Sequence, residues 1–270
     1  SRHQLTIGRR PGTLFSYPIS YWYSRYVKSF DSTTIQEAKK YYQGAIAVNP
    51  GNALAHAYLS EIIAGEMALT GDLSNEGLSL AQRALKLDPF CQQAYQALAV
   101  NRLLHRQMEE CIHILEQGLE LNPRAADFRA AVGSIMIFAG NFDRGVKILE
   151  DVIKLNCPVV WWQVFSYSCY FYHIGRYDEA IYWADQAEVH VTSVLLVKIA
   201  AYSQMEQINQ VNSLLSQVPE ELVSSCFERR LLERYFYSDI FVSEVQEGLL
   251  KVRLALLETV EDNPRLEAAS

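Results

Sequence analysis

The phrase Lys86-Leu87-Asp88-Pro89 returns 34 residues later as Glu120-Leu121-Asn122-Pro123. A variant, Ala47-Val48-Asn49-Pro50, precedes the first copy, and Lys154-Leu155-Asn156-Cys157-Pro158 follows the second, so that successive prolines lie 39, 34 and 35 residues apart. This recurrence decides the fold, because a fixed period of roughly 20 to 50 residues is the sequence signature of a repeat architecture.

Each repeat has the pattern of two amphipathic helices. Ala38, Tyr42 and Ala45 lie at helical spacing before Pro50, and the proline ends that helix because it cannot continue the hydrogen-bond ladder. Another apolar helix begins after each proline, at 53–64 after Pro50 and at 91–104 after Pro89. Alternating strand patterns are nearly absent. We therefore predict an all-α fold of helical hairpins.

A second phrase marks the turn inside a hairpin. Gly140-Asn141-Phe142-Asp143-Arg144-Gly145 matches Gly175-Arg176-Tyr177-Asp178-Glu179-Ala180, again 35 residues later. Glycine is favoured just after a helix because it adopts the left-handed conformation without strain. We expect Gly140 and Gly175 to end the first helix of their hairpins.

These linked positions resemble the tetratricopeptide repeat (TPR) family over roughly residues 18–217. The matches are Ala38, Tyr42, Ala45 and Pro50; Tyr95, Leu98, Cys111, Leu115, Gly118 and Pro123; Val132, Gly133, Gly145 and Leu149; and Ala180 and Ala187. Units after residue 190 are degenerate. The resemblance implies an α-solenoid, a right-handed superhelix of about five to six TPR-like hairpins, with the first helix of each hairpin on the inner wall.

The chain divides into three expected parts. Residues 1–17 form a basic N-terminal segment, 18–217 the TPR-like repeat array, and 218–270 capping helices near 221–237 and 240–258. The aromatic segment 12–30 can fold as a helix that covers one end of the array.

A second resemblance rests on the 39-residue spacing before Pro89, which predicts an insertion around Leu69-Thr70-Gly71-Asp72-Leu73. With the flanking segments 52–59 and 81–89, this extended turn is similar to the TPR tails of ToxR/OmpR-type bacterial regulators, including the HilA-like invasion regulators. The resemblance implies that the region serves a transcriptional activator of virulence or related genes.

The charge of the chain bears on its partners. The formal net charge is −7, but residues 1–30 carry five basic residues and no acidic one, so the remainder carries −12. An acidic body repels a phosphate backbone, and we expect this region to bind no nucleic acid.

Five scattered cysteines without a C-x-x-C pair argue against a disulfide framework and favour a cytoplasmic setting. No apolar run reaches the ~18 residues of a membrane span, so we expect no membrane insertion.

The sequence predicts no enzyme. It lacks a Gly-x-Ser-x-Gly elbow and both glycine-rich phosphate-binding motifs. Cys169 and His173 share a helix face, but no second ligand pair accompanies them, so we expect no metal and no cofactor.

The resemblance to TPR proteins assigns a groove-binding wall to the first helices. Its candidate residues are Tyr58, Glu61, Gln93, Gln96, Ser134, Phe138, Trp162, Phe165, Cys169, Tyr172 and His173. This wall is aromatic and amide-bearing, and it lacks the Lys/Asn/Arg clamp with which TPR domains hold acidic chaperone tails. The alternative for the cluster from Trp162 to Tyr172 is that a neighbouring helix or the aromatic segment buries it as core.

We therefore expect a protein–protein interaction or regulatory domain, most specifically the TPR region of a bacterial transcriptional activator, with a protein partner or self-association. Two alternatives stay open. One is a sensory module that binds a small ligand in the aromatic groove, and the other is a free-standing assembly adaptor.

Overall fold

The computed structural model describes residues 19–154, 160–187, 191–219, 222 and 227–261, with side chains as far as Lys251. Every regular element in these residues is a helix, which confirms the predicted all-α fold. The basic N-terminal segment 1–17 lies outside the described residues. None of the described helices is long and apolar enough to cross a membrane.

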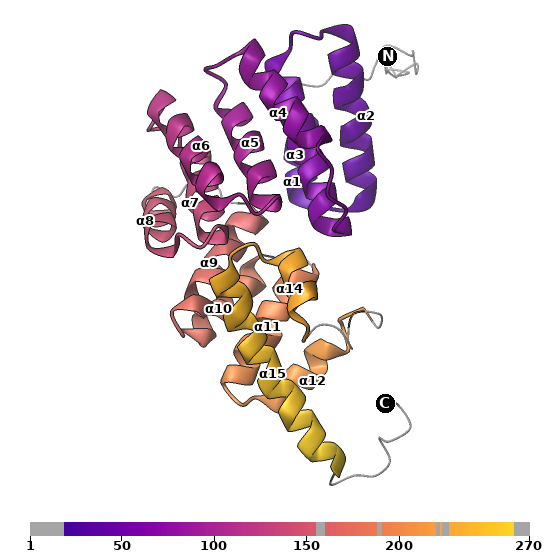
Figure 1. Ribbon diagram of the computed structural model, residues 1–270, viewed down its shortest axis with the longest axis vertical. Helices are drawn as coiled ribbons and strands as arrows, with labels where there is room; N and C mark the ends of the chain where they lie inside the picture. Colours follow the sequence, from indigo (N-terminus) through magenta and orange to yellow (C-terminus); the bar gives the residue numbers. More distant parts are fainter. Residues whose placement is uncertain (1–18, 155–159, 188–190, 220–221, 223–226, 262–270) are drawn as a thin grey trace, which may run out of the picture.

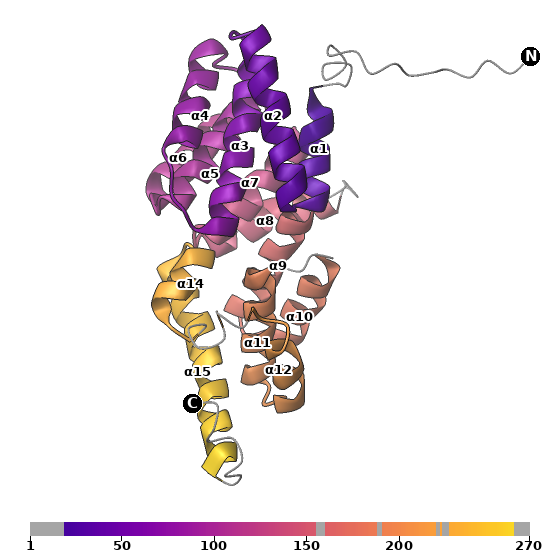
Figure 2. The same cartoon turned by 90° about the vertical axis from the view of Figure 1, so that its right-hand side faces the viewer.

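Successive helices of the array pair into hairpins. The pairs are α1 (Ser20–Ser29) with α2 (Ser32–Val48), α3 (Ala53–Thr70) with α4 (Glu76–Leu87), α5 (Gln92–Leu104) with α6 (Met108–Leu121), α7 (Ala126–Phe138) with α8 (Phe142–Ile153), α9 (Trp161–His173) with α10 (Tyr177–Gln186), and α11 (Thr192–Gln204) with α12 (Ile208–Leu215). The first helices contact one another in chain order from α3 to α11. The hairpins thus stack into an elongated solenoid (Figures 1 and 2).

The turn inside most hairpins contains one residue with positive φ. Gly71, Gly140 and Gly175 have φ of 74°, 86° and 75°, as the sequence predicts for the last two. Arg106 and Glu206 occupy the same place in their hairpins with φ of 59°, where a side chain is strained. The same turn geometry is therefore kept whether or not glycine is present.

Helix α3 accommodates the predicted insertion. It has 18 residues, whereas α5 has 13, and it ends where the N–H of Gly71 donates to the carbonyl of Met67. The additional turn brings Gly71 against the side chain of Arg234, so that a Cβ at residue 71 would clash with the Arg234 guanidinium group. The insertion thus extends the first helix towards the C-terminal helices.

The C-terminal part contains α14 (Arg229–Tyr235) and α15 (Asp239–Glu261). The sequence places helices near 221–237 and 240–258, so α14 begins later than expected, and residues 220–221 and 223–226 lie outside the described residues. Helix α15 packs on α11 and α9, which are first helices. It covers the inner side of the C-terminal hairpins.

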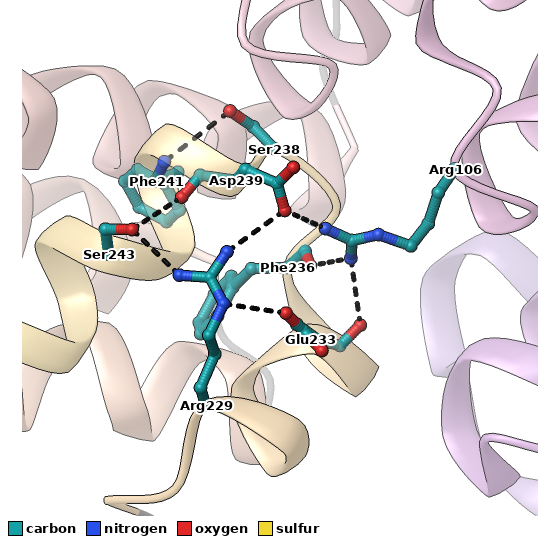
Figure 3. Close-up of polar contacts among 8 residues, drawn as sticks. All are labelled: Arg106, Arg229, Glu233, Phe236, Ser238, Asp239, Phe241 and Ser243. Carbon is teal, nitrogen blue, oxygen red and sulfur yellow. Dashed lines mark hydrogen bonds and ion pairs between the residues drawn. The ribbon is translucent and has the colours of Figure 1, made fainter.

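Arg106 joins the turn between α5 and α6 to this C-terminal part (Figure 3). Its Nη2 lies 2.5 Å from Asp239 Oδ1, and its Nη1 donates to the carbonyl of Phe236 at 3.2 Å. Arg229 also binds Asp239 Oδ1, at 3.2 Å, and its Nε donates to Glu233 Oε1. These contacts hold the segment between α14 and α15 against the middle of the array.

Candidate functional site

The candidate groove residues all lie on first helices. Tyr58 and Glu61 are on α3, Gln93 and Gln96 on α5, Ser134 and Phe138 on α7, and Trp162, Phe165, Cys169, Tyr172 and His173 on α9. Two other segments of the chain cover them. Helix α1 lies over the N-terminal part of the wall and α15 over the C-terminal part, so that the wall is divided into two differently covered regions.

Glu61 is the centre of a polar cluster under α1. Its Oε2 accepts hydrogen bonds from Tyr23 Oη at 2.6 Å and from Gln96 Nε2 at 2.9 Å. Its Oε1 accepts a hydrogen bond from Gln93 Nε2. The ring of Tyr23 stacks on Tyr58 with 4.3 Å between centroids. The structure therefore joins four of the predicted wall residues to one side chain of α1.

The Glu61 carboxyl group is buried, with only 6% of the residue exposed. Burial raises its pKa from 4.5 to about 7, while the hydrogen bonds from Tyr23, Gln93 and Gln96 act in the opposite direction. No basic side chain in the described part of the chain contributes to this pKa. Glu61 is thus a carboxyl group poised to ionise near neutral pH without a cationic partner.

The phenols around Glu61 stay neutral. Burial raises the pKa of Tyr23 well above 10 and the pKa of Tyr58 to about 12, and the negative charge of Glu61 acts in the same direction. Tyr26 donates from its hydroxyl group to the backbone carbonyl of Glu61 at 3.3 Å, and burial likewise raises its pKa. The cluster therefore contains one group that titrates near pH 7.

A cavity of about 290 Å³ lies beside this cluster. Helices α1, α3, α5, α7 and α9 surround it, together with residues 191–193 at the start of α11 and the segment after α14. Its aromatic lining residues are Tyr23, Tyr26, Phe30, Phe138, Trp161, Trp162, Phe165, Tyr235 and Tyr237. Five of the candidate groove residues line it: Glu61, Gln96, Phe138, Trp162 and Phe165.

The remaining residues of α9 face a different environment. Tyr172 Oη donates to the backbone carbonyl of Glu244 at 3.0 Å, and His173 Nδ1 lies 2.8 Å from Glu244 Oε1. The His173 ring stacks on Phe142, with 3.8 Å between centroids. Burial raises the pKa of the Cys169 thiol. These side chains join the core between α9 and α15, and the cavity does not include them.

Ser134 is fully buried in α7 and does not line the cavity. Within the described residues, no group of three or more His, Cys, Asp or Glu side chains is arranged to hold a metal ion.

The sequence predicts the aromatic segment 12–30 as a cover, but it does not single out the side chains that close the cavity. Tyr23, Tyr26 and Phe30 belong to α1 and to the residue that follows it, and Phe30 contacts Trp161 with 4.7 Å between ring centroids. Their spacing, i, i+3 and i+7, is that of one helix face. That spacing is the signal by which the covering face of α1 can be recognised. The contribution of Tyr235 and Tyr237 has no comparable signal.

The matches to known proteins come from solved structures. No protein-family model matches the chain, and no curated protein matches it in sequence. Among solved structures, the chain is similar to YrrB, "a TPR protein with an unusual peptide-binding site", with a TM-score of 0.41 and 15% identity over 67% of this chain and 94% of that chain.

A second similar structure is that of Naa15/Naa10 bound to HypK-THB. Its TM-score is 0.36, with 14% identity over 93% of this chain. The chain spans only 37% of the length of that protein.

Proposed function

We propose that this chain is a protein-interaction and regulatory unit that binds its partner along the edge formed by its inter-repeat turns. The proposal rests on apolar side chains that recur at this edge. Val48, Leu87 and Leu121 lie two residues before the repeat proline in three successive units, and Phe90 follows the second of these prolines. We call these four residues the turn stripe.

The turn stripe is open to solvent. Val48 is 73% exposed and Phe90 78% exposed, Leu121 is also exposed, and Leu87 is half-buried. Val48, Leu87 and Leu121 are the last residues of α2, α4 and α6, and equivalent positions of stacked repeats lie in a row along a solenoid. Exposed apolar side chains that recur along one edge are typical of protein interaction sites, where aromatic side chains supply most of the binding energy.

The test compares two doubly substituted variants of the natural full-length protein. Val48→Ser with Phe90→Ser changes the turn stripe. Tyr182→Ser with Ile240→Ser is the matched control, because these residues are 56% and 58% exposed and lie on α10 and α15. Each protein is purified from its source cells, and the co-purifying proteins are quantified.

We expect at least one partner to be retained by the wild type and the control and to fall at least about fivefold with the turn-stripe variant. Urea unfolding of the three proteins should be similar, because exposed side chains contribute little to stability. Equal retention of all partners by the turn-stripe variant would contradict the proposal. Light scattering identifies self-association if the wild type, but not the variant, forms larger particles.

We further propose that the unit belongs to a bacterial transcriptional activator of virulence or related genes, in which partner binding changes the activity of a DNA-binding domain. The support is the resemblance of segments 52–59 and 81–89, with the lengthened α3 between them, to the TPR tails of ToxR/OmpR-type regulators. The natural coding sequence and a reporter assay test this step. A natural protein without a DNA-binding domain would contradict it and favour the assembly adaptor.

A further inference from the structure

The cavity under α1 differs from ordinary packing defects in its chemistry. Among the described residues, its lining is mostly apolar and aromatic, and it contains one acidic side chain, Glu61, and no Lys, Arg or His. A carboxylate buried without a cation carries a large desolvation penalty. The hydrogen bonds from Tyr23, Gln93 and Gln96 offset that penalty only in part, since the pKa of Glu61 is still raised.

Glu61 retains capacity for a further donor. A carboxylate can accept about four hydrogen bonds. Tyr23 and Gln96 donate to its Oε2, and Gln93 donates to its Oε1. These three donors leave room for about one more hydrogen bond, at Oε1.

The aromatic walls suit a cation. Ring faces carry negative electrostatic potential, and rings within about 6 Å attract ammonium groups, most strongly where water is excluded. Tyr23 and Tyr26 line the cavity on the α1 side, and Trp162 and Phe165 line it on the α9 side. The same rings offer apolar surface to the rest of a ligand.

The size of the cavity limits the ligand. A dry apolar cavity of about 150 Å³ already holds benzene, and ordinary ligand pockets begin near 300 Å³. The cavity of about 290 Å³ therefore accepts a single ring with a short side chain. Ala64, Gly65 and Ala68 of α3 keep this space open, since they carry little or no side chain.

From this combination we infer that the cavity is a binding site for a small organic ammonium ion with an apolar ring, bound with its nitrogen at Glu61 and its ring among the aromatic walls. The inference is independent of the turn stripe. Binding joins α1 to α3, α5 and α9 through one ligand, and it places an otherwise uncompensated carboxylate beside a positive charge.

Three probes of nearly equal shape test the inference on the full chain. They are 2-phenylethylammonium, the neutral 2-phenylethanol and the anion phenylacetate, each titrated calorimetrically at pH 8 and at pH 5.5. Glu61→Gln removes the charge and keeps the shape. Ala68→Leu fills part of the cavity and leaves Glu61 in place.

We expect the wild type at pH 8 to bind the ammonium probe at least about tenfold more tightly than the alcohol, the equivalent of about 1.4 kcal/mol. Phenylacetate should bind least. Glu61→Gln should reduce the ratio to about one, and Ala68→Leu should weaken both the ammonium ion and the alcohol. Lowering the pH to 5.5 should weaken the ammonium ion at least about fivefold and leave the alcohol unchanged, because Glu61 becomes protonated.

Two results would overturn the inference. The first is no binding of the ammonium probe to the wild type at millimolar concentration, and the second is an ammonium-to-alcohol ratio that is the same at both pH values. The pH comparison uses the wild type alone, so the test remains decisive even if Glu61→Gln fails to fold. Loss of partner binding in the turn-stripe variant leaves this outcome unaffected.

Discussion

Tyr23 and Glu61 are 38 residues apart in the chain, and the Tyr23 hydroxyl group donates a 2.6 Å hydrogen bond to the Glu61 carboxyl group. This contact joins α1, which precedes the regular repeats, to the inner wall of the solenoid. It also places the group that titrates near pH 7 at the side of the cavity. The packing of α1 over the inner wall is therefore coupled to the ionisation of Glu61.

Tyr23→Phe should lower the free energy of unfolding by about 1–2 kcal/mol, because it removes one of the two donors to the buried Glu61 Oε2 while the ring can still stack on Tyr58. Urea unfolding measures the change. Tyr182→Phe is the control, since it removes the same hydroxyl group from an exposed tyrosine. Equal stability of the two variants would contradict the assignment of this hydrogen bond.

Stability should fall as the pH rises from about 4.5 to about 7. The folded protein keeps a proton on Glu61 in this range, whereas the unfolded chain has released it, so that raising the pH favours the unfolded state. The rise in pKa from 4.5 to about 7 corresponds to roughly 3–4 kcal/mol at about 1.4 kcal/mol per pKa unit. Above pH 7 this contribution is constant.

The difference between the wild type and Glu61→Gln isolates this effect. The other titratable groups that interact with Glu61 among the described residues are Tyr23, Tyr26, Tyr42, Tyr58 and Cys91, and the pKa of each is raised, so that they remain neutral. Burial raises the pKa of Glu244 as well, but this group is present in both proteins. Urea midpoints of the wild type should decline more steeply with pH than those of the variant. Parallel curves would refute the prediction.

The sequence predicts the inner wall and the aromatic segment 12–30 as a candidate cover, but not the contacts by which the wall is covered. Tyr58 and Glu61 can be placed on one face of α3 from helical periodicity and from the order of hairpins. A solenoid pattern specifies contacts between adjacent repeats only. Phe30 reaches Trp161, and Arg106 reaches Asp239. Both contacts cross several repeats, so no local pattern specifies them.

Arg106→Ala should loosen the C-terminal segment without unfolding the array. Its ion pair with the exposed Asp239 contributes about 0–1 kcal/mol, but its hydrogen bond to the Phe236 carbonyl also fixes the wall that carries Tyr235 and Tyr237. We expect faster amide exchange at 233–239 and little change in the global unfolding midpoint. Arg144→Ala, which breaks an ion pair with Glu116 inside the array, should leave exchange at 233–239 unchanged.

Substitutions at the two kinds of turn residue, glycine and non-glycine, should change the stability of the protein in opposite directions. Gly175→Ala should cost about 1 kcal/mol, because φ is 75° although no atom lies within 4 Å of the added Cβ. Glu206→Gly should raise stability by up to about 1 kcal/mol, because it relieves a non-glycine residue at φ of 59°. Thermal unfolding measures both changes. A loss of stability with Glu206→Gly would show that its side chain makes a compensating contact.

Substitutions of Tyr172 and Trp162 should separate the two regions of α9. Tyr172 is 3% exposed and hydrogen-bonds to the backbone of α15, so Tyr172→Ala should cost about 3–5 kcal/mol, as large core truncations do. Trp162 is half-buried and borders the cavity, so Trp162→Ala should cost less than half as much while it weakens the ammonium probe. Urea unfolding and calorimetry on the same samples measure the two quantities. A greater loss of stability for Trp162→Ala than for Tyr172→Ala would mean that the cavity wall, and not the contact with α15, is the structural core of this helix.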